Sequence, residues 1–283
     1  MDDKLTIQWI QKLICNGADL NQTISDSNGK STTLLHTAAL ECNEDIVKLL
    51  VSNGASLEAK NHKDQTALQV AAFWNNSNIV KLLLSKGANP LKLPLHFAIL
   101  HNLDDAAEIV QLLLSNGANV DARDKFKNIP LHLATEQRNC EIIQLLLDYN
   151  ADVNAFGRYG RTPLQIAIIP NDRKATKILL KNGANPNLTS KQGFIPLHVG
   201  ISLDYFDIVE LLVAYDADLN LKDHRGFTSM HMAIQTKNMK MVNVLLRNGA
   251  AVDIQDIIGN NAFEKALDME LSGVAKMIWL TQL

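Results

Sequence analysis

The stretch Ile129–Asn154, IPLHLATEQRNCEIIQLLLDYNADVN, decides the fold, because close variants of it recur along almost the whole chain. Pro130 suits the first position of a helix, where its missing N–H would have no partner in any case. A polar break follows near Arg138, and then EIIQLLL places apolar residues on one helical face. Asn150 closes the unit, since Asn tolerates the left-handed conformation found at helix ends. The stretch therefore predicts a helix-turn-helix unit.

Two anchors show how regularly this unit repeats. The closing turns lie at Gly17, Gly54, Gly87, Gly117, Asn150, Gly183, Asp216 and Gly249, at intervals of 37, 33, 30, 33, 33, 33 and 33 residues. The opening tetrapeptides TLLH, TALQ, LPLH, IPLH, TPLQ, IPLH, TSMH and NAFE end at His36, Gln69, His96, His132, Gln165, His198, His231 and Glu264. The second helices carry apolar residues at i, i+3 and i+4, as at Ile142, Leu145 and Leu146. One unit cannot bury such a stripe alone, so eight units are predicted to stack as a solenoid.

The 33-residue period and the TPLH-like tetrapeptide resemble the ankyrin-repeat family, from about residue 5 to residue 281. The resemblance implies an all-α ankyrin-repeat solenoid of about eight helix-turn-helix units, with hairpin fingers between units and a capping helix at each end. It also implies that the fingers and the first helices line a concave face that binds partners.

We expect a single domain spanning residues 1–283. Its predicted parts are an N-terminal cap helix and loop at 1–28, units one to seven at 29–60, 61–91, 92–121, 122–154, 155–187, 188–220 and 221–253, and a C-terminal capping unit at 254–283. The finger of unit one has a polar insert that ends at Thr32, which predicts a mobile loop. The finger of unit three is shortened, which would leave a notch in the row of fingers. The last unit places Lys265, Asp268 and Glu270 among apolar residues, as a terminal repeat with one polar face requires.

Composition limits the class of protein. The chain is 47% hydrophobic and 20% charged, which is ordinary for a chain with a buried core. It has no apolar run of about 18 residues, and Asp2 and Asp3 stand where a signal peptide needs a basic segment. These features predict no membrane insertion and a location in the cytoplasm or nucleus, or in a host-cell cytoplasm if the chain is a microbial effector secreted by another route.

The sequence offers no group suited to metal binding or catalysis. Cys15, Cys42 and Cys140 are odd in number and lack CxxC spacing, so neither a disulfide framework nor a zinc site is predicted. The motifs GxSxG, GxxxxGK[ST] and HExxH are missing. Asp104 and Asp105 are adjacent, and adjacent side chains on a helix point apart. We therefore expect no metal, no cofactor and no enzymatic activity.

Five of the eight histidines occupy the tetrapeptide: His36, His96, His132, His198 and His231. The resemblance implies that this histidine is structural and bonds to the tetrapeptide threonine and to nearby backbone. Leu93, Ile129 and Ile195 replace that threonine in three units, so those imidazoles need other hydrogen-bond partners. Three further histidines, in fingers or bends, are expected to be solvated: His62, His101 and His224.

The row of fingers carries the functional signal. In units two and four to eight, the finger residues include ten Lys or Arg and four Asp, an excess of six positive charges in a chain of net charge -3. Aromatic residues lie among them, and exposed Tyr and Phe beside Arg are typical of interface anchors. The residues predicted to bind a partner are Arg123, Lys125, Phe126, Phe156, Arg158, Tyr159, Arg161, Lys191, Phe194, Lys222, Arg225 and Phe227, with Phe73 and Trp74 of unit two as a second contact. The alternative is a solvated row in which Phe194 and Phe227 pack against the neighbouring finger.

These features predict a non-enzymatic adaptor that binds another protein, through an acidic or extended segment, and acts as a monomer. A second hypothesis is nucleic-acid or anionic-ligand binding by the same basic row, which would be steeply salt-dependent. The negative net charge argues against nucleic acid. A third hypothesis is regulation of an enzyme, or action on a host protein as a secreted microbial effector.

Overall fold

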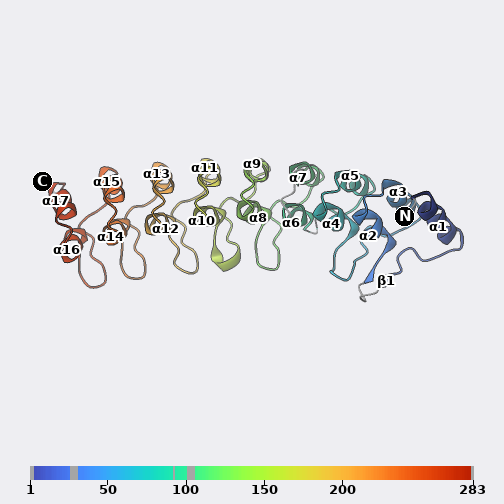
Figure 1. The fold of residues 1–283 in the computed structure, drawn as a ribbon, viewed down its shortest axis with the longest axis horizontal. Helices are drawn as coiled ribbons and strands as arrows, with labels where there is room; N and C mark the ends of the chain where they lie inside the picture. The colour runs from blue at the N-terminus through green and yellow to red at the C-terminus, as the bar shows by residue number, and fades with distance from the viewer. Residues whose placement is uncertain (1–2, 26–30, 92, 101–105, 282–283) are drawn as a thin grey trace. The chain divides into compact units, whose positions relative to one another are not determined.

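The computed structural model describes residues 3–25, 31–91, 93–100 and 106–281 (Figure 1). The chain divides into two compact bodies. The N-terminal body contains residues 1–125 and 148–151, and the C-terminal body contains residues 126–147 and 152–283. Residues 26–30, which form part of the insert at 21–32 predicted to be a mobile loop, lie outside the described residues, as do His101, Asp104 and Asp105.

The N-terminal body begins with one helix and a short hairpin. Its elements are α1 (Asp3–Cys15), β1 (Ile24–Ser25), β2 (Ser31–Thr32), α2 (Leu34–Leu40), α3 (Glu44–Ser52), α4 (Ala67–Phe73), α5 (Ser77–Ser85), α6 (Pro94–Leu100) and α7 (Ala106–Ser115). The first helices α2, α4 and α6 pack against one another, and so do the second helices α3, α5 and α7. Helix α1 packs on α3, as expected for a capping helix. Strands β1 and β2 are antiparallel and pair Ile24 with Thr32, so the base of finger one is a hairpin.

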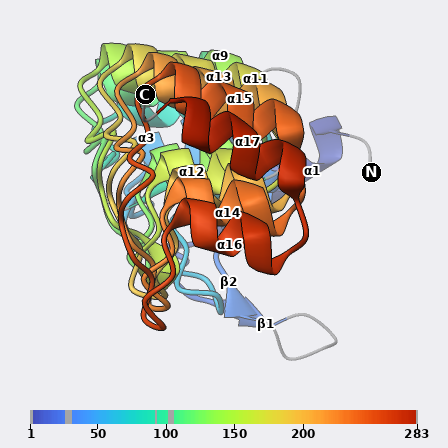
Figure 2. The same ribbon diagram turned by 90° about the vertical axis from the view of Figure 1, so that its left-hand side faces the viewer.

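The C-terminal body repeats the same two layers. Its elements are α8 (Pro130–Glu136), α9 (Cys140–Asp148), the 3-10 turn η1 (Arg158–Gly160), α10 (Pro163–Ile168), α11 (Arg173–Lys181), α12 (Pro196–Ser202), α13 (Phe206–Ala214), α14 (Ser229–Gln235), α15 (Met239–Arg247), α16 (Ala262–Asp268) and α17 (Ser272–Leu280). Helices α8, α10, α12, α14 and α16 pack in sequence, and α11, α13, α15 and α17 form the second layer. Figure 2 shows α13, α15 and α17 above α12, α14 and α16, with the fingers along one side. Eight helix pairs follow α1 within the described ranges, which confirms the predicted all-α repeat fold.

The buried face of the second helices is rotated from the one that the sequence predicts. In α9, Ile142 and Leu146 are fully buried as expected, but the third fully buried residue is Ile143, whereas Leu145 is half-exposed. Helix α3 repeats this pattern with Val47 in the core. The reason is visible in α11, α13 and α15, because each packs against the neighbouring second helices as well as against a first helix. Contact with those neighbours therefore decides which side of the apolar face is fully buried.

Helix ends follow the predicted chemistry. Asn150 and Asp216, which replace the closing glycine, both have positive φ, at 61° and 60°. At the helix starts, Thr162 accepts a hydrogen bond from the backbone N–H of Gln165, and the Gln165 side chain accepts one from the N–H of Thr162. This reciprocal capping satisfies two donors that the helix leaves unpaired.

The last helix pair presents a mixed face. Asp268 and Glu270 are exposed, as expected of a polar terminal face, but Leu267 of α16 and Trp279 of α17 are also about half exposed. Leu267 lies one period after Ile234, which α14 buries completely. In the described part of the chain, helices are too short or too polar to cross a bilayer.

Candidate functional site

Three consecutive fingers of the C-terminal body place aromatic rings and guanidinium groups in alternation. The Arg158 guanidinium carbon lies 4.9 Å from the centre of the Phe126 ring and 4.7 Å from that of Tyr159. The Arg161 guanidinium carbon lies 5.7 Å from the Tyr159 ring and 5.5 Å from the Phe194 ring. All four separations are within the range of cation–π attraction. We call these five residues the finger ladder.

Buried polar side chains below the finger ladder fix its backbone. The Asn128 side-chain oxygen accepts a hydrogen bond of 2.8 Å from the backbone N–H of Arg158. His132 Nε2 lies 3.1 Å from the carbonyl oxygen of Arg161, and Gln165 Nε2 donates to the carbonyl of Phe194 at 3.1 Å. Asn128, His132 and Gln165 are all buried. The tetrapeptide residues, which looked purely structural, therefore hold the finger ladder in place.

Tyr159 has an unusual backbone conformation for its residue type. Its φ of 60° and ψ of 14° are left-handed, and Gly160 follows with φ of 66°. The N–H of Arg161 bonds to the carbonyl of Arg158 across these two residues, which closes a tight turn. A non-glycine residue at positive φ costs of order 1 kcal/mol and persists only where its surroundings enforce it. The turn places Tyr159, 51% exposed, at the tip of the finger between the two arginines.

The arginines of the finger ladder keep unused donors. The Arg158 side chain is exposed and forms no hydrogen bond or ion pair with any described residue. Arg161 makes one long contact, 3.4 Å to the Gln192 side chain, and its Nε atom is buried without a partner among the described residues. Stacking occupies the faces of a guanidinium but leaves its N–H groups directed outward in the plane. The finger ladder therefore offers oriented cationic donors.

Unit seven uses the same residue types for internal packing. Phe227 is only 9% exposed and stacks on His231, with Arg225 and Lys265 over its ring at 4.4 Å and 4.2 Å. Arg225 is also paired with Asp223 at 3.0 Å. Phe227 is therefore nearly buried among groups of its own unit and of α16, and its role as a partner anchor stays a prediction.

The remaining predicted site residues are not members of the five-residue finger ladder. Arg123 and Lys125 are exposed in the N-terminal body, and Phe156 is 43% exposed at the start of finger five. Lys191 is exposed, with its stem against Gly160, where an added Cβ would come within 2.5 Å of Lys191 Cγ. Lys222 donates to the backbone carbonyl of Gln255 at 2.9 Å.

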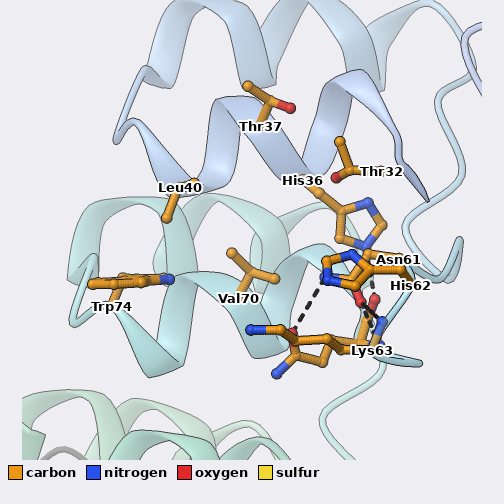
Figure 3. A pocket seen from close by; sticks show the side chains of 10 residues that line it. Thr32, His36, Thr37, Leu40, Asn61, His62, Lys63, Val70 and Trp74 are labelled. Carbon is orange, nitrogen blue, oxygen red and sulfur yellow. Dashed lines mark hydrogen bonds between the residues drawn. The ribbon is translucent and has the colours of Figure 1, made fainter. Parts of the chain in front are cut away.

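Phe73 and Trp74 form a separate cluster in the N-terminal body. Their rings meet edge to face at 5.5 Å, and Phe73 also meets Phe97 of α6 at 6.3 Å. Trp74 is 50% exposed, whereas Phe73 is half-buried. Trp74 borders a hollow of about 230 Å³ between α2, α4 and finger two (Figure 3).

The tetrapeptide histidines differ in how their ring nitrogens are bonded. His36 bonds to Thr33 and to the Gln65 carbonyl. His132, which has no threonine partner, accepts from the N–H of Ile129 instead. His198 lacks the threonine too, and its Nε2 atom finds no partner among the described residues. Burial lowers the pKa of His198 to about 4, against the attraction of Asp223.

This low pKa predicts acid sensitivity. The folded chain holds His198 neutral, whereas the unfolded chain takes up a proton near the ordinary pKa of 6.5, so stability is complete above that pH and falls as the pH drops toward about 4. The loss at low pH amounts to about 3 kcal/mol, at about 1.4 kcal/mol per pKa unit. His198→Gln, which copies Gln165 of unit five, is expected to flatten the fall in melting temperature between about pH 7 and about pH 4.5. An equal fall in both proteins would contradict this assignment.

Gly157 is a second position at which packing can be tested. It is buried, and an added Cβ would lie 2.5 Å from the Asn128 side-chain oxygen and 2.6 Å from the His132 ring. Gly157→Ala is expected to cost about 1 to 3 kcal/mol in urea unfolding, because both buried groups must shift. Gly273→Ala is the control, since no atom lies within 4 Å of its added Cβ and it sits in α17. The control is expected to be neutral or slightly stabilising.

Metal ligation finds no geometric support in the described part of the chain. No group of three or more His, Cys, Asp or Glu residues there is placed to hold a metal ion. Cys15 and Cys42 are exposed free thiols, and burial raises the pKa of the Cys140 thiol, so Cys140 is not an activated nucleophile.

Stacked helix pairs with a row of fingers define a repeat protein built to bind through its surface. Comparison makes the class specific, because the family model for ankyrin repeats (3 copies) matches residues 5–93, 95–190 and 170–256. The chain belongs to the ankyrin-repeat family. It is similar to the ankyrin repeat domain of Bcl-3, described as a unique member of the IkappaB protein family, with 29% identity and a TM-score of 0.70 over 76% of this chain and 98% of that one. No curated protein sequence gives a significant match.

These comparisons support a protein–protein interaction domain. Sequence reasoning missed Asn128 and Gly157, which position the finger ladder. Neither has a motif of its own, because their effect comes from contact with the following or preceding finger.

Proposed function

We propose that the chain is a non-enzymatic interaction scaffold that binds an acidic segment of a partner protein at the finger ladder. The observation that carries this proposal is the pair of stacked arginines, of which Arg158 has no polar side-chain partner among the described residues. A carboxylate can accept two parallel hydrogen bonds from one guanidinium, in a charge-assisted pair stronger than a neutral hydrogen bond. Contact with two rings limits the motion of each arginine, so less side-chain entropy is lost on binding.

The rings contribute in a second way. Phe126 and Tyr159 are 44% and 51% exposed, so a bound segment would cover apolar surface next to each charge pair. Removing water strengthens the charge pair, and clusters of aromatic residues with Arg carry much of the affinity in protein interfaces. All five ladder residues come from successive fingers of one body, so a single copy of the chain suffices.

The basic row also motivates the competing proposal of nucleic-acid or other anion binding. Its density of available charge is lower than the sequence suggests, because Arg225 is paired with Asp223 and Lys222 is bonded to backbone. Phosphate-backbone binding requires many simultaneous cationic contacts. We therefore place a protein segment first. The three free cysteines suit a reducing location such as the cytoplasm or nucleus, or a host-cell cytoplasm for a secreted effector.

Affinity capture with the purified chain tests the proposal. Captured proteins are identified, and peptides tiled across them are titrated against the chain. Binding is expected to concentrate in peptides rich in Asp and Glu, with no measurable uptake of a generic single-stranded or duplex oligonucleotide at about 150 mM salt. Oligonucleotide binding that falls steeply with salt would favour the competing proposal, and preference for neutral or basic peptides would refute the first one.

A further inference from the structure

The hollow beside Trp74 is assembled from parts that the finger ladder does not use. Its apolar side consists of Leu40 from α2, Val70 from α4 and Trp74 directly after α4. Its polar side includes Thr32 of β2 and His62 and Lys63 of finger two. Figure 3 shows Trp74, Leu40 and Val70 on one side and His62 and Lys63 on the other. Leu40 and Trp74 are each about half exposed. The hollow therefore has an accessible apolar wall facing a polar one.

Hydrogen bonds between fingers hold the polar wall in position. The N–H of His62 donates to the carbonyl of Ser31 at 2.8 Å, which ties finger two to β2. The Asn61 side-chain oxygen accepts from the N–H groups of Lys63 and Gln65, at 2.9 Å and 3.1 Å. His36 Nε2 reaches the carbonyl of Gln65 at 2.7 Å. The hollow is therefore a pre-formed feature, which lowers the ordering cost of binding.

Charge in the hollow has one sign. Among the described lining residues, Lys63 is the sole permanently charged group, and no described residue forms an ion pair or hydrogen bond with its ammonium group. The neighbouring acid, Asp64, is already paired with Lys60. His62 contacts the carbonyl oxygen of Ser31 through its Nδ1 atom, and its Nε2 atom has no hydrogen-bond partner among the described residues. An anionic group beside Lys63 would meet complementary charge and no opposing carboxylate.

Size limits what the hollow can hold. A volume of about 230 Å³ is below the range of about 300 to 1,000 Å³ found for most small-molecule sites. It exceeds the cavity of about 150 Å³ that holds a benzene molecule in an apolar core. One aromatic side chain fits this space, and an edge or offset contact with the exposed Trp74 ring would add attraction beyond burial.

We propose that the hollow docks one aromatic side chain of a partner protein whose neighbouring residue is acidic. The ring packs on Leu40, Val70 and Trp74, and the carboxylate pairs with Lys63. This site is independent of the finger ladder, since it uses other residues in the other body. It also gives the long finger of unit one a role, because β2 supplies one edge of the hollow.

The test uses the full chain and the peptide probe acetyl-Gly-Phe-Asp-Gly-Ser-amide. Three indole N–H signals, from Trp9, Trp74 and Trp279, are followed by NMR. The signal that is lost in the Trp74→Phe variant is assigned to Trp74. The probe is expected to shift the Trp74 signal saturably and to leave the other two in place. Probes with Phe→Ala or Asp→Asn are expected to bind at least about fivefold more weakly. Equal shifts of all three indoles, or equal affinity for all three probes, would overturn the proposal.

Two lysine variants of the same body supply the matched comparison. Lys63→Gln is expected to weaken the probe about fivefold, whereas Lys86→Gln, at an exposed lysine after α5 and outside the hollow, leaves affinity unchanged. Equal effects of the two substitutions would refute the role of Lys63. Arg158→Glu is expected to leave probe binding intact, so failure of the finger-ladder proposal and failure of this one give different results. Melting temperatures of all variants confirm that each is folded.

Discussion

The triple variant Arg158→Glu, Arg161→Glu, Tyr159→Ala is expected to lose partner binding by at least about 100-fold while keeping the fold. Reversal at the two arginines replaces two attractive pairs with two repulsive ones, and removal of Tyr159 takes away the ring that both guanidinium groups contact. The fold is expected to persist because no helix core contains these side chains, and the bonds to Asn128 and His132 use backbone atoms of the finger. Calorimetric titration of an acidic peptide identified by capture measures the loss.

The control for charge is the double variant Lys177→Glu, Lys181→Glu. Both lysines are exposed on α11 in the same body, so the net charge changes by the same amount away from the fingers. This control is expected to retain binding within about twofold at physiological salt, where distant charges are screened. Equal losses in the control and the triple variant would show that binding follows overall charge, and the finger-ladder mapping would be wrong.

A graded variant separates geometry from charge. Arg158→Lys with Arg161→Lys keeps both positive charges, but an ammonium group cannot offer the planar pair of donors that a guanidinium gives to a carboxylate. Binding is expected to weaken about tenfold, between the wild-type chain and the charge-reversed variant. Full affinity in the lysine variant would mean that the site recognises charge density alone.

The repeat architecture follows from the sequence because its determinants are local. A proline, a capping Thr and a closing Gly or Asn each act within one turn of backbone, so the period of helix ends is readable without a structure. The finger ladder is readable only in part. Composition places Arg158 among aromatic residues, but its contact with Phe126, 32 residues earlier, depends on how successive fingers align.

Phe126 and Phe227 show what the sequence leaves open. Both are finger phenylalanines near arginine, yet one is 44% exposed and the other 9%. The difference is position, since Phe126 lies three residues before its tetrapeptide and Phe227 lies directly before it. The earlier position is the fingertip, and the later one sits over the buried histidine, where Phe227 stacks on His231. The number of residues between each phenylalanine and its tetrapeptide therefore distinguishes the exposed ring from the buried one. The hollow beside Trp74 has no such local signal, because four separate elements form it.

Leu146→Ala is expected to destabilise the chain by about 2 to 5 kcal/mol, because Leu146 on α9 is fully buried and truncation leaves a cavity. In a stack of repeats each unit depends mainly on its neighbours, so weakening the pair of α8 and α9 lowers its coupling to the pair that follows it. Urea unfolding is therefore expected to separate into two transitions, seen as differing midpoints when helix content and local probes are followed together.

The comparison variant is Leu267→Ala on α16, where the side chain is 52% exposed in the last helix pair. Little apolar surface is buried there and no unit depends on it from the far side within the described residues, so a cost below about 1 kcal/mol and fraying of one end are expected. The number of unfolding transitions decides between two descriptions of how the stack is stabilised. A single transition at one shared midpoint for both variants would mean that the units unfold together, and stability would then belong to the whole array rather than to contacts between neighbours.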